Sequence, residues 1–182
     1  CLKYEKYLKL KKKIPFSILR LGTLYGWSKR MRYDVAINKI IRDMIFLKKV
    51  EVLGGNQLRF FCYNKFACKI IDSIIKDSTN RYENKILNIG VFNTNIIKLV
   101  DKILKINKIK NINVVHEKHT IDKRSYEVSL RTVKKMYLNL NFKNLVKNSI
   151  HETYLKIKND KKPFDRKKIT LNIYRDYLNL KK

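Results

Sequence analysis

The chain has 182 residues, and its 43 lysines and arginines against 15 aspartates and glutamates give a formal net charge of +28. With 45% apolar residues and only five glycines, this composition excludes collagen, a Gly/Ser linker and an acidic disordered tail, and it is sufficient for one hydrophobic core. Lysine outnumbers arginine by 33 to 10, whereas planar recognition of phosphate favours arginine, so the charge alone does not favour a nucleic-acid-binding function.

Hydrophobic periodicity predicts alternating helices and strands along the chain. In chain order, we expect helices at 2–12, 34–48, 66–76, 94–105, 130–137, 145–158 and 169–180, and strands at 16–26, 50–53, 60–63, 86–90 and 112–115. The run at 16–26 is almost continuously apolar, which is typical of a parallel strand covered on both faces. Asp34 is expected to cap the helix that follows it, because its side chain can accept hydrogen bonds from first-turn amides. The alternation indicates an α/β fold.

The three cysteines, Cys1, Cys62 and Cys68, are odd in number and lack Cys-x-x-Cys spacing, which argues against a disulfide framework or a structural zinc site. Cys62 is expected to be a buried strand residue, because free cysteine packs as a small hydrophobe. His116 and His119 have the spacing of a metal-binding pair, but residues i and i+3 of a strand face opposite ways, so we expect no metal. This cysteine usage fits the reducing cytoplasm.

The segment 11–26 imitates a signal peptide, with a basic start and an apolar run, but Arg20 interrupts the run and no small-x-small cleavage pattern follows. It is also shorter than the roughly 20 apolar residues that a membrane span requires. We therefore expect a soluble protein without a membrane partner. Because the chain starts with Cys1 rather than methionine, we also expect it to be a fragment of a longer protein.

Five segments resemble motifs of one enzyme family. Residues 18–26 read Ile-Leu-Arg-Leu-Gly-Thr-Leu-Tyr-Gly, residues 28–38 read Ser-Lys-Arg-Met-Arg-Tyr-Asp-Val-Ala-Ile-Asn, and residues 54–63 read Gly-Gly-Asn-Gln-Leu-Arg-Phe-Phe-Cys-Tyr. Further on, residues 87–90 read Leu-Asn-Ile-Gly and residues 122–128 read Asp-Lys-Arg-Ser-Tyr-Glu-Val. Each is similar to a segment of the extended short-chain dehydrogenases, the NAD-dependent nucleotide-sugar epimerase and dehydratase family. Their shared order and spacing carry the resemblance.

The resemblance implies a fold and a domain organisation. The expected fold class is α/β: the C-terminal part of a Rossmann-type NAD(P)-binding fold, interleaved with a small α/β substrate-binding subdomain. Residues 1–26 are expected to hold the end of the catalytic helix region and a late Rossmann strand, and residues 27–58 a segment of the substrate subdomain. Residues 59–110 are expected to return to Rossmann strand and helix elements, and residues 111–182 to form the C-terminal substrate-binding subdomain with its tail helices.

The resemblance also implies NAD or NADP as the cofactor, bound mainly by an N-terminal half outside this chain. In the family, the Gly-rich dinucleotide fingerprint and the catalytic Tyr-x-x-x-Lys both precede the Leu-Arg strand. When Glu5 is matched to the acidic residue of the catalytic helix, the family's Lys falls at Cys1 or just before it, and its Tyr falls upstream. We therefore expect no catalytic residue here, and no hydride chemistry from this chain alone.

The resemblance carries substrate-binding roles onto five residues. Arg59 and Arg124 match arginines that bind the diphosphate of a nucleotide sugar, and a guanidinium holds two phosphate oxygens through parallel charge-assisted bonds. Thr23 stands where most relatives have an Asn that reaches the substrate phosphate, and its hydroxyl can donate one hydrogen bond. Asp34 and Asn38 are placed near the nucleotide, and a spacing of one helical turn would put them on one face.

Two further positions are expected to lie beside the cofactor, and the sequence departs from the family pattern at two places. Leu21 and Gly22 are expected to line the nicotinamide side of the cleft. After Arg59, the sequence at 61–67 is one residue shorter than the family pattern and lacks the Asp that caps the next helix in relatives. Trp27 stands where the family usually has Pro.

Two other interpretations stay open at this point: a non-catalytic basic module that binds nucleic acid or anionic surfaces, and a structural remnant without a ligand. The basic module predicts that binding to generic DNA or RNA weakens steeply with salt. The resemblance instead predicts a nucleotide-sugar substrate, a homodimer of the full-length enzyme and no nucleic-acid partner. These motifs do not distinguish between nucleotides, between sugars, or between epimerase, dehydratase and reductase activity.

Overall fold

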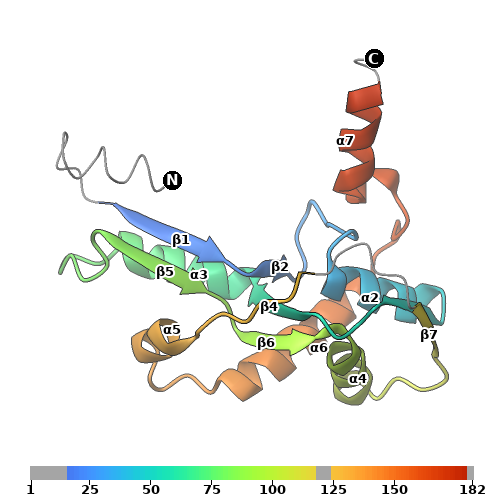
Figure 1. Cartoon of the computed structure of the whole chain (residues 1–182), viewed down its shortest axis with the longest axis horizontal. Coiled ribbons are helices and arrows are strands. Elements are labelled where there is room, and N and C mark those ends of the chain that lie inside the picture. The colour runs from blue at the N-terminus through green and yellow to red at the C-terminus, as the bar shows by residue number, and fades with distance from the viewer. Residues whose placement is uncertain (1–15, 118–123, 180–182) are drawn as a thin grey trace.

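The computed structural model describes residues 16–117 and 124–179, which form three small sheets with helices packed around them (Figure 1). The helix predicted at 2–12 lies outside the described residues, as do His119 and the first two residues of the 122–128 motif. The predicted α/β class is confirmed, because strands and helices alternate along the chain.

Three parallel strand pairs build the sheets, and two of them involve the run at 16–26, for which the apolar pattern predicted parallel pairing. They are β1 (Ser17–Leu21) with β5 (Lys85–Ile89), β2 (Thr23–Tyr25) with β4 (Leu58–Tyr63), and β3 (Lys49–Leu53) with β7 (Asn113–Glu117). Strand β4 also pairs antiparallel with β6 (Phe92–Asn95), so it is the central strand of the order β2-β4-β6. The short strand β6 was missed by the sequence analysis, which started a helix at residue 94.

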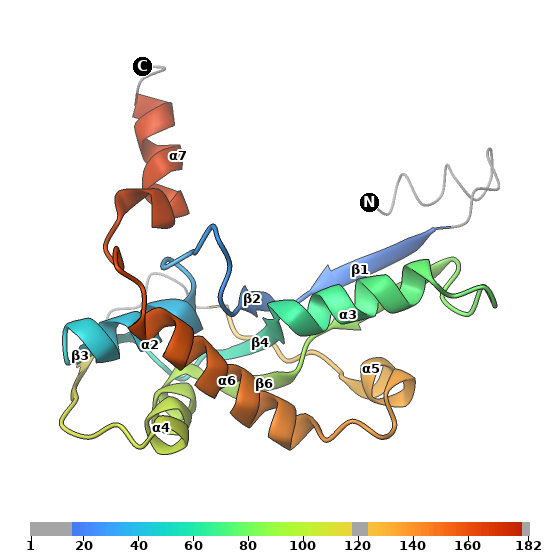
Figure 2. The same cartoon turned by 180° about the vertical axis from the view of Figure 1, so that it is seen from behind.

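Helices fill the connections between strands and continue beyond the last strand. They are α2 (Ala36–Phe46), α3 (Asn64–Ile75), α4 (Ile96–Asn107), α5 (Arg131–Met136), α6 (Phe142–Lys158) and α7 (Thr170–Asn179), with a 3-10 turn η2 (Arg166–Lys168) before α7. Helix α6 packs against both α2 and α4, α3 runs alongside β1, and α7 extends away from the body (Figure 2).

The start of α2 differs from the sequence prediction. The helix begins at Ala36 behind Val35, which makes no side-chain cap, so the expected capping role of Asp34 is wrong. The Asp34 carboxylate instead forms an ion pair with Arg32 at 2.8 Å. Asp34 lies outside the first helical turn, and the adjacent guanidinium offers a charged partner that an amide does not. Helix α3, which lacks the family's capping Asp, begins at Asn64 also without a side-chain cap.

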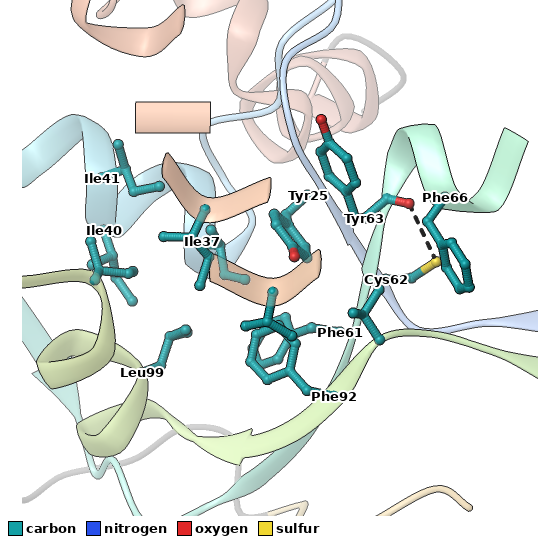
Figure 3. Close-up of a cluster of buried hydrophobic side chains, with 14 of the residues drawn as sticks. Tyr25, Ile37, Ile40, Ile41, Phe61, Cys62, Tyr63, Phe66, Phe92 and Leu99 are labelled. Atoms are coloured by element: carbon teal, nitrogen blue, oxygen red, sulfur yellow. Dashed lines mark hydrogen bonds between the residues drawn. The ribbon is translucent and has the colours of Figure 1, made fainter. Parts of the chain in front are cut away.

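An aromatic cluster at the junction of β2, β4 and β6 forms the centre of the core (Figure 3). The rings of Phe61 and Phe92 stack with centroids 5.4 Å apart, and Tyr25 meets Phe92 edge-on at 6.2 Å. The Tyr25 hydroxyl shares a 2.6 Å hydrogen bond with the Ser149 hydroxyl, which joins β2 to α6. The apolar side chains that α2 and α4 add to this cluster include Ile37, Ile40, Ile41 and Leu99.

Cys62 lies in β4 and is fully buried, which confirms the sequence prediction. Burial raises the pKa of its thiol to about 12, so the thiol stays protonated and unreactive at neutral pH. Cys68 is exposed on α3, and both of these cysteines are free.

Asp160 joins the C-terminal segment to the loop before α2. Its carboxylate accepts hydrogen bonds from the Tyr33 hydroxyl at 2.6 Å and from the Lys168 ammonium at 2.7 and 2.6 Å. The backbone N–H of Tyr33 also donates to the Lys168 carbonyl at 2.8 Å. Burial raises the pKa of Asp160, but the hydrogen bonds from Lys168 and Tyr33 outweigh it and hold the pKa below its usual value.

We expect Asp160→Asn to lower the free energy of unfolding by roughly 1–2 kcal/mol near neutral pH, because Tyr33 and Lys168 lose a charged acceptor. Because the folded-state pKa is depressed, the wild-type carboxylate contributes its stability above the unfolded pKa of about 3.9 and loses it as the pH falls through the folded pKa. Urea unfolding of both proteins across this range measures the effect. A difference in unfolding free energy that stays constant from neutral to strongly acidic pH would contradict the role given to Asp160.

Candidate functional site

A cavity of about 370 Å³ lies at the carboxyl ends of β1 and β5. These parallel strands end side by side (Figure 1), and in open α/β sheets this edge is where ligands bind. Leu21 and Gly22, the two positions expected to face the cofactor, both line the cavity. Its remaining lining residues are Arg20, Phe60, Asn88, Tyr126, Glu127, Val128 and Ser129.

The floor of this cavity is the Phe60 ring, which packs against two glycines. Phe60 is 2% exposed. A Cβ added at Gly22 would lie 2.9 Å from Phe60 Cδ1, and a Cβ added at Gly90 would overlap the ring outright. Gly22 also marks the point where the predicted strand at 16–26 divides into β1 and β2, and its N–H donates to the Ile89 carbonyl at 2.9 Å. Glycine is therefore required here by the close approach of an aromatic ring.

The segment 124–130 crosses β4 and β6 and forms the cover of the cavity. The Tyr126 N–H donates to the Leu58 carbonyl at 3.2 Å, and the Leu58 N–H donates to the Ser125 hydroxyl at 3.0 Å. The Asn93 side chain donates to the Val128 carbonyl at 2.9 Å and accepts from the Val128 N–H at 3.1 Å. These bonds hold the Arg-Ser-Tyr part of the fifth motif in place against the sheet.

Arg59 and Arg124, the two predicted diphosphate-binding residues, are brought together by this cover. Arg59 is partly buried, and its Nη1 donates to the carbonyls of Leu58, at 2.9 Å, and of Arg124. Its guanidinium carbon lies 5.5 Å from the centroid of the Tyr126 ring, which also lines the cavity. Arg124 is exposed. The Arg59 guanidinium therefore contacts the Arg124 backbone and lies near Tyr126 of the cavity lining, although 65 positions separate the two arginines in the sequence.

The other three predicted substrate-binding residues do not line this cavity. Thr23 is partly buried in β2, opposite Phe61 in the strand register. Asn38 is 3% exposed, and its side chain accepts from the Gly26 N–H at 3.2 Å and donates to the Arg32 carbonyl at 3.1 Å. It therefore supports the turn after β2, and its contact with a nucleotide stays a prediction. Asp34 precedes α2, so the expected shared helical face with Asn38 does not form.

Sequence reasoning did not single out Phe60, Asn93 or Tyr126. Tyr126 could have been found, because it belongs to the fifth motif itself. The role of Asn93 had no local signal, because its partner Val128 is 35 residues away. Phe60 reads in the sequence as an ordinary strand residue.

Within residues 16–117 and 124–179, no group of three His, Cys, Asp or Glu side chains is arranged to hold a metal ion. In the same part of the chain, no helix has the length and apolar character that crossing a bilayer requires.

Solved structures share this fold at low sequence identity. The UDP-glucuronic acid 4-epimerase from Bacillus cereus, in complex with UDP-glucuronic acid and NAD, has a TM-score of 0.62 at 22% identity, over 84% of this chain and 48% of its own. The UDP-N-acetylglucosamine 4-epimerase from Methanobrevibacter ruminantium has a TM-score of 0.67 at 19% identity, over 85% and 49%. The dTDP-glucose 4,6-dehydratase from Bacillus anthracis, in complex with NAD, has a TM-score of 0.67 at 16% identity, over 90% and 50%.

No protein-family model matches the sequence, and no curated protein does. The chain nevertheless has the fold of NAD-dependent nucleotide-sugar epimerases and dehydratases, and it spans about half the length of the solved structures that it matches. The resemblance inferred from the five motifs, to the C-terminal half of such enzymes, is confirmed at the level of the fold.

We expect Gly90→Ala to lower the free energy of unfolding by about 1–3 kcal/mol, because the added Cβ overlaps the buried Phe60 ring. Phe60→Leu makes room at the same place, so the double variant is expected to lose less than the sum of the two single variants. Urea unfolding of the wild type and the three variants measures this coupling. Strictly additive losses would show that the ring and the glycine do not constrain each other.

Proposed function

We propose that this chain supplies the nucleotide-sugar-binding side of an NAD-dependent epimerase or dehydratase. The observation that carries the proposal is the contact of the Arg59 guanidinium with the Arg124 carbonyl and with the Tyr126 ring, which lines the cavity at the carboxyl ends of β1 and β5. The shared fold supports it. One such enzyme structure contains UDP-glucuronic acid and NAD, and another contains NAD. The cytoplasm as the location and a homodimer as the assembly belong to the same proposal.

The Arg59 guanidinium is oriented before any substrate binds. Its Nη1 donates to the carbonyls of Leu58 and Arg124, and its carbon lies 5.5 Å from the Tyr126 ring centroid. A guanidinium held in this way loses little conformational freedom on binding, so more of the interaction energy appears as affinity. In the proposed complex, Arg59 and Arg124 stabilise the negative charge of the diphosphate by charge-assisted hydrogen bonds.

The cavity fits the reactive end of a nicotinamide cofactor. The lining combines apolar Leu21 and Val128 with the polar residues Asn88 and Ser129, which is the combination of groups found in small-molecule and cofactor sites. When bound, NAD or NADP supplies the hydride chemistry. The chain's own residues orient that end and exclude water from the floor through buried Phe60. The catalytic Tyr and Lys and the dinucleotide fingerprint are proposed to lie upstream, outside this chain.

We expect Arg59→Ala to weaken nucleotide-sugar binding roughly tenfold to hundredfold in the protein at its native length, because a charged bidentate contact to the diphosphate is lost. Arg59→Lys keeps the charge but not the bidentate geometry, so an intermediate loss is expected. Calorimetric titration with UDP-glucose, GDP-mannose and dTDP-glucose, each in the presence of NAD, measures the affinities. The matched control is Arg81→Ala, because Arg81 is exposed and its ion pair joins it to Asp77 in the turn before β5.

Unchanged affinity in Arg59→Ala would refute the role of this arginine. Binding of generic DNA that falls steeply with salt, with no preference for any nucleotide sugar, would support the basic module instead. Binding of neither kind of ligand would support the structural remnant.

A further inference from the structure

A second and larger cavity, of about 660 Å³, lies beside β6 between α4, α5 and the first turns of α6. These four elements gather on one side of the molecule (Figure 1). The lining of this cavity shares only Glu127 with the cavity at the ends of β1 and β5. Its volume is in the range of small-molecule sites, about 300–1,000 Å³. The inference drawn from it is therefore independent of the proposed function.

The wall of this cavity combines apolar residues with four lysines. The apolar surface comes from Phe92, Ile106, Leu130, Phe142 and Val146. The cationic groups are Lys102 of α4, Lys134 of α5, and Lys143 and Lys147 of α6. Three separate helices thus contribute lysines to the lining of one cavity.

These charges are not neutralised within the part of the chain that the structure describes. There, none of the four lysines forms an ion pair, and Glu127 is the single acidic residue in the lining. The Lys102 ammonium lies 5.1 Å from the centroid of the Phe92 ring, so one cation stands directly at the apolar floor. A ligand that fills this space meets an apolar surface and an excess of three positive charges, four lysines less one glutamate.

We propose that this cavity binds a small organic phosphate that carries an aromatic or apolar body. The body covers the surface around Phe92 and Phe142, and the phosphate accepts from the lysine ammonium groups, which bind phosphate as compact point charges. Apolar contact and charge pairing act on different parts of such a ligand. A phosphate alone or an apolar body alone therefore uses only part of the site.

The test is a calorimetric titration of the protein at its native length with 1-naphthyl phosphate, with inorganic phosphate and 1-naphthol as separate arms. We expect one equivalent of 1-naphthyl phosphate to bind, with an affinity at least roughly tenfold above that of either part. The variant Lys143→Gln/Lys147→Gln is expected to weaken this binding by roughly tenfold or more. The variant Lys156→Gln/Lys158→Gln removes the same charge from the other end of α6, outside the cavity, and is expected to change the affinity less than about twofold.

A second measurement requires no substitution. Acetylation of lysines, followed residue by residue with mass spectrometry, is expected to show that 1-naphthyl phosphate protects Lys102, Lys134, Lys143 and Lys147 but not Lys156 or Lys158. Arg59→Ala is expected to leave the affinity for the probe unchanged, which separates this site from the one in the proposed function. Equal losses in the two lysine variants, equal protection of all lysines, or no stoichiometric binding would each overturn the proposal.

Discussion

The candidate site and the core both depend on one strand, β4, whose side chains alternate between two covered faces. Phe61 faces the aromatic cluster with Phe92, whereas Phe60 faces the cavity and packs against Gly22 and Gly90. Both aromatic rings are buried, because β4 is central in its sheet and the segment 124–130 covers its other face. A shift of β4 by one residue would exchange these faces and move Arg59 away from Arg124. The register of this strand therefore positions the binding residues as well as the core.

Much of the fold was predictable because each signal was local. Apolar strands followed by periodic helices predicted the α/β class, and a continuous apolar run predicted parallel pairing. The prediction failed where a contact from elsewhere decided the structure. The Phe60 ring sits at Gly22, where the predicted strand divides into β1 and β2. The helix cap failed for a local reason instead, because Arg32 forms an ion pair with the Asp34 carboxylate that the pattern assigned to the cap. Strand β6 was missed because only its antiparallel partner β4 makes it a strand.

The candidate site was predictable to a similar extent. The motifs identified Arg59 and Arg124, but a sequence motif does not show how close in space two segments lie when 65 residues separate them. Their meeting depends on the bonds that hold 124–130 against the sheet, and one of these, from Leu58 to Ser125, spans 67 residues. Asn38 shows the opposite case. The sequence permits both a nucleotide-binding role and a structural role for it, and its buried hydrogen bonds within the chain favour the structural role.

Acidic residues are scarce in this chain, and two of them link distant parts of the fold. With 15 carboxylates among 43 basic side chains, most lysines remain solvated, and two of the described carboxylates join segments far apart in the chain. Asp160 joins the C-terminal segment to Tyr33, and Glu152 joins α6 to the Tyr63 hydroxyl at 2.8 Å. A lysine hydrogen bond also accompanies each of these two carboxylates. Net charge of this size opposes compaction by self-repulsion. A carboxylate that joins two elements and binds a lysine offsets part of this repulsion at the contact between them.

The two cavities share a wall, and that wall is the segment 124–130. Asn93 lines the larger cavity, Val128 lines the smaller one, and two reciprocal hydrogen bonds connect these residues. Glu127, between the two, borders both spaces. A ligand in either cavity therefore contacts the same short segment, which also carries the Arg124 carbonyl that orients Arg59. Occupation of one cavity can therefore change the affinity of the other only if the first ligand changes the free energy of this shared segment.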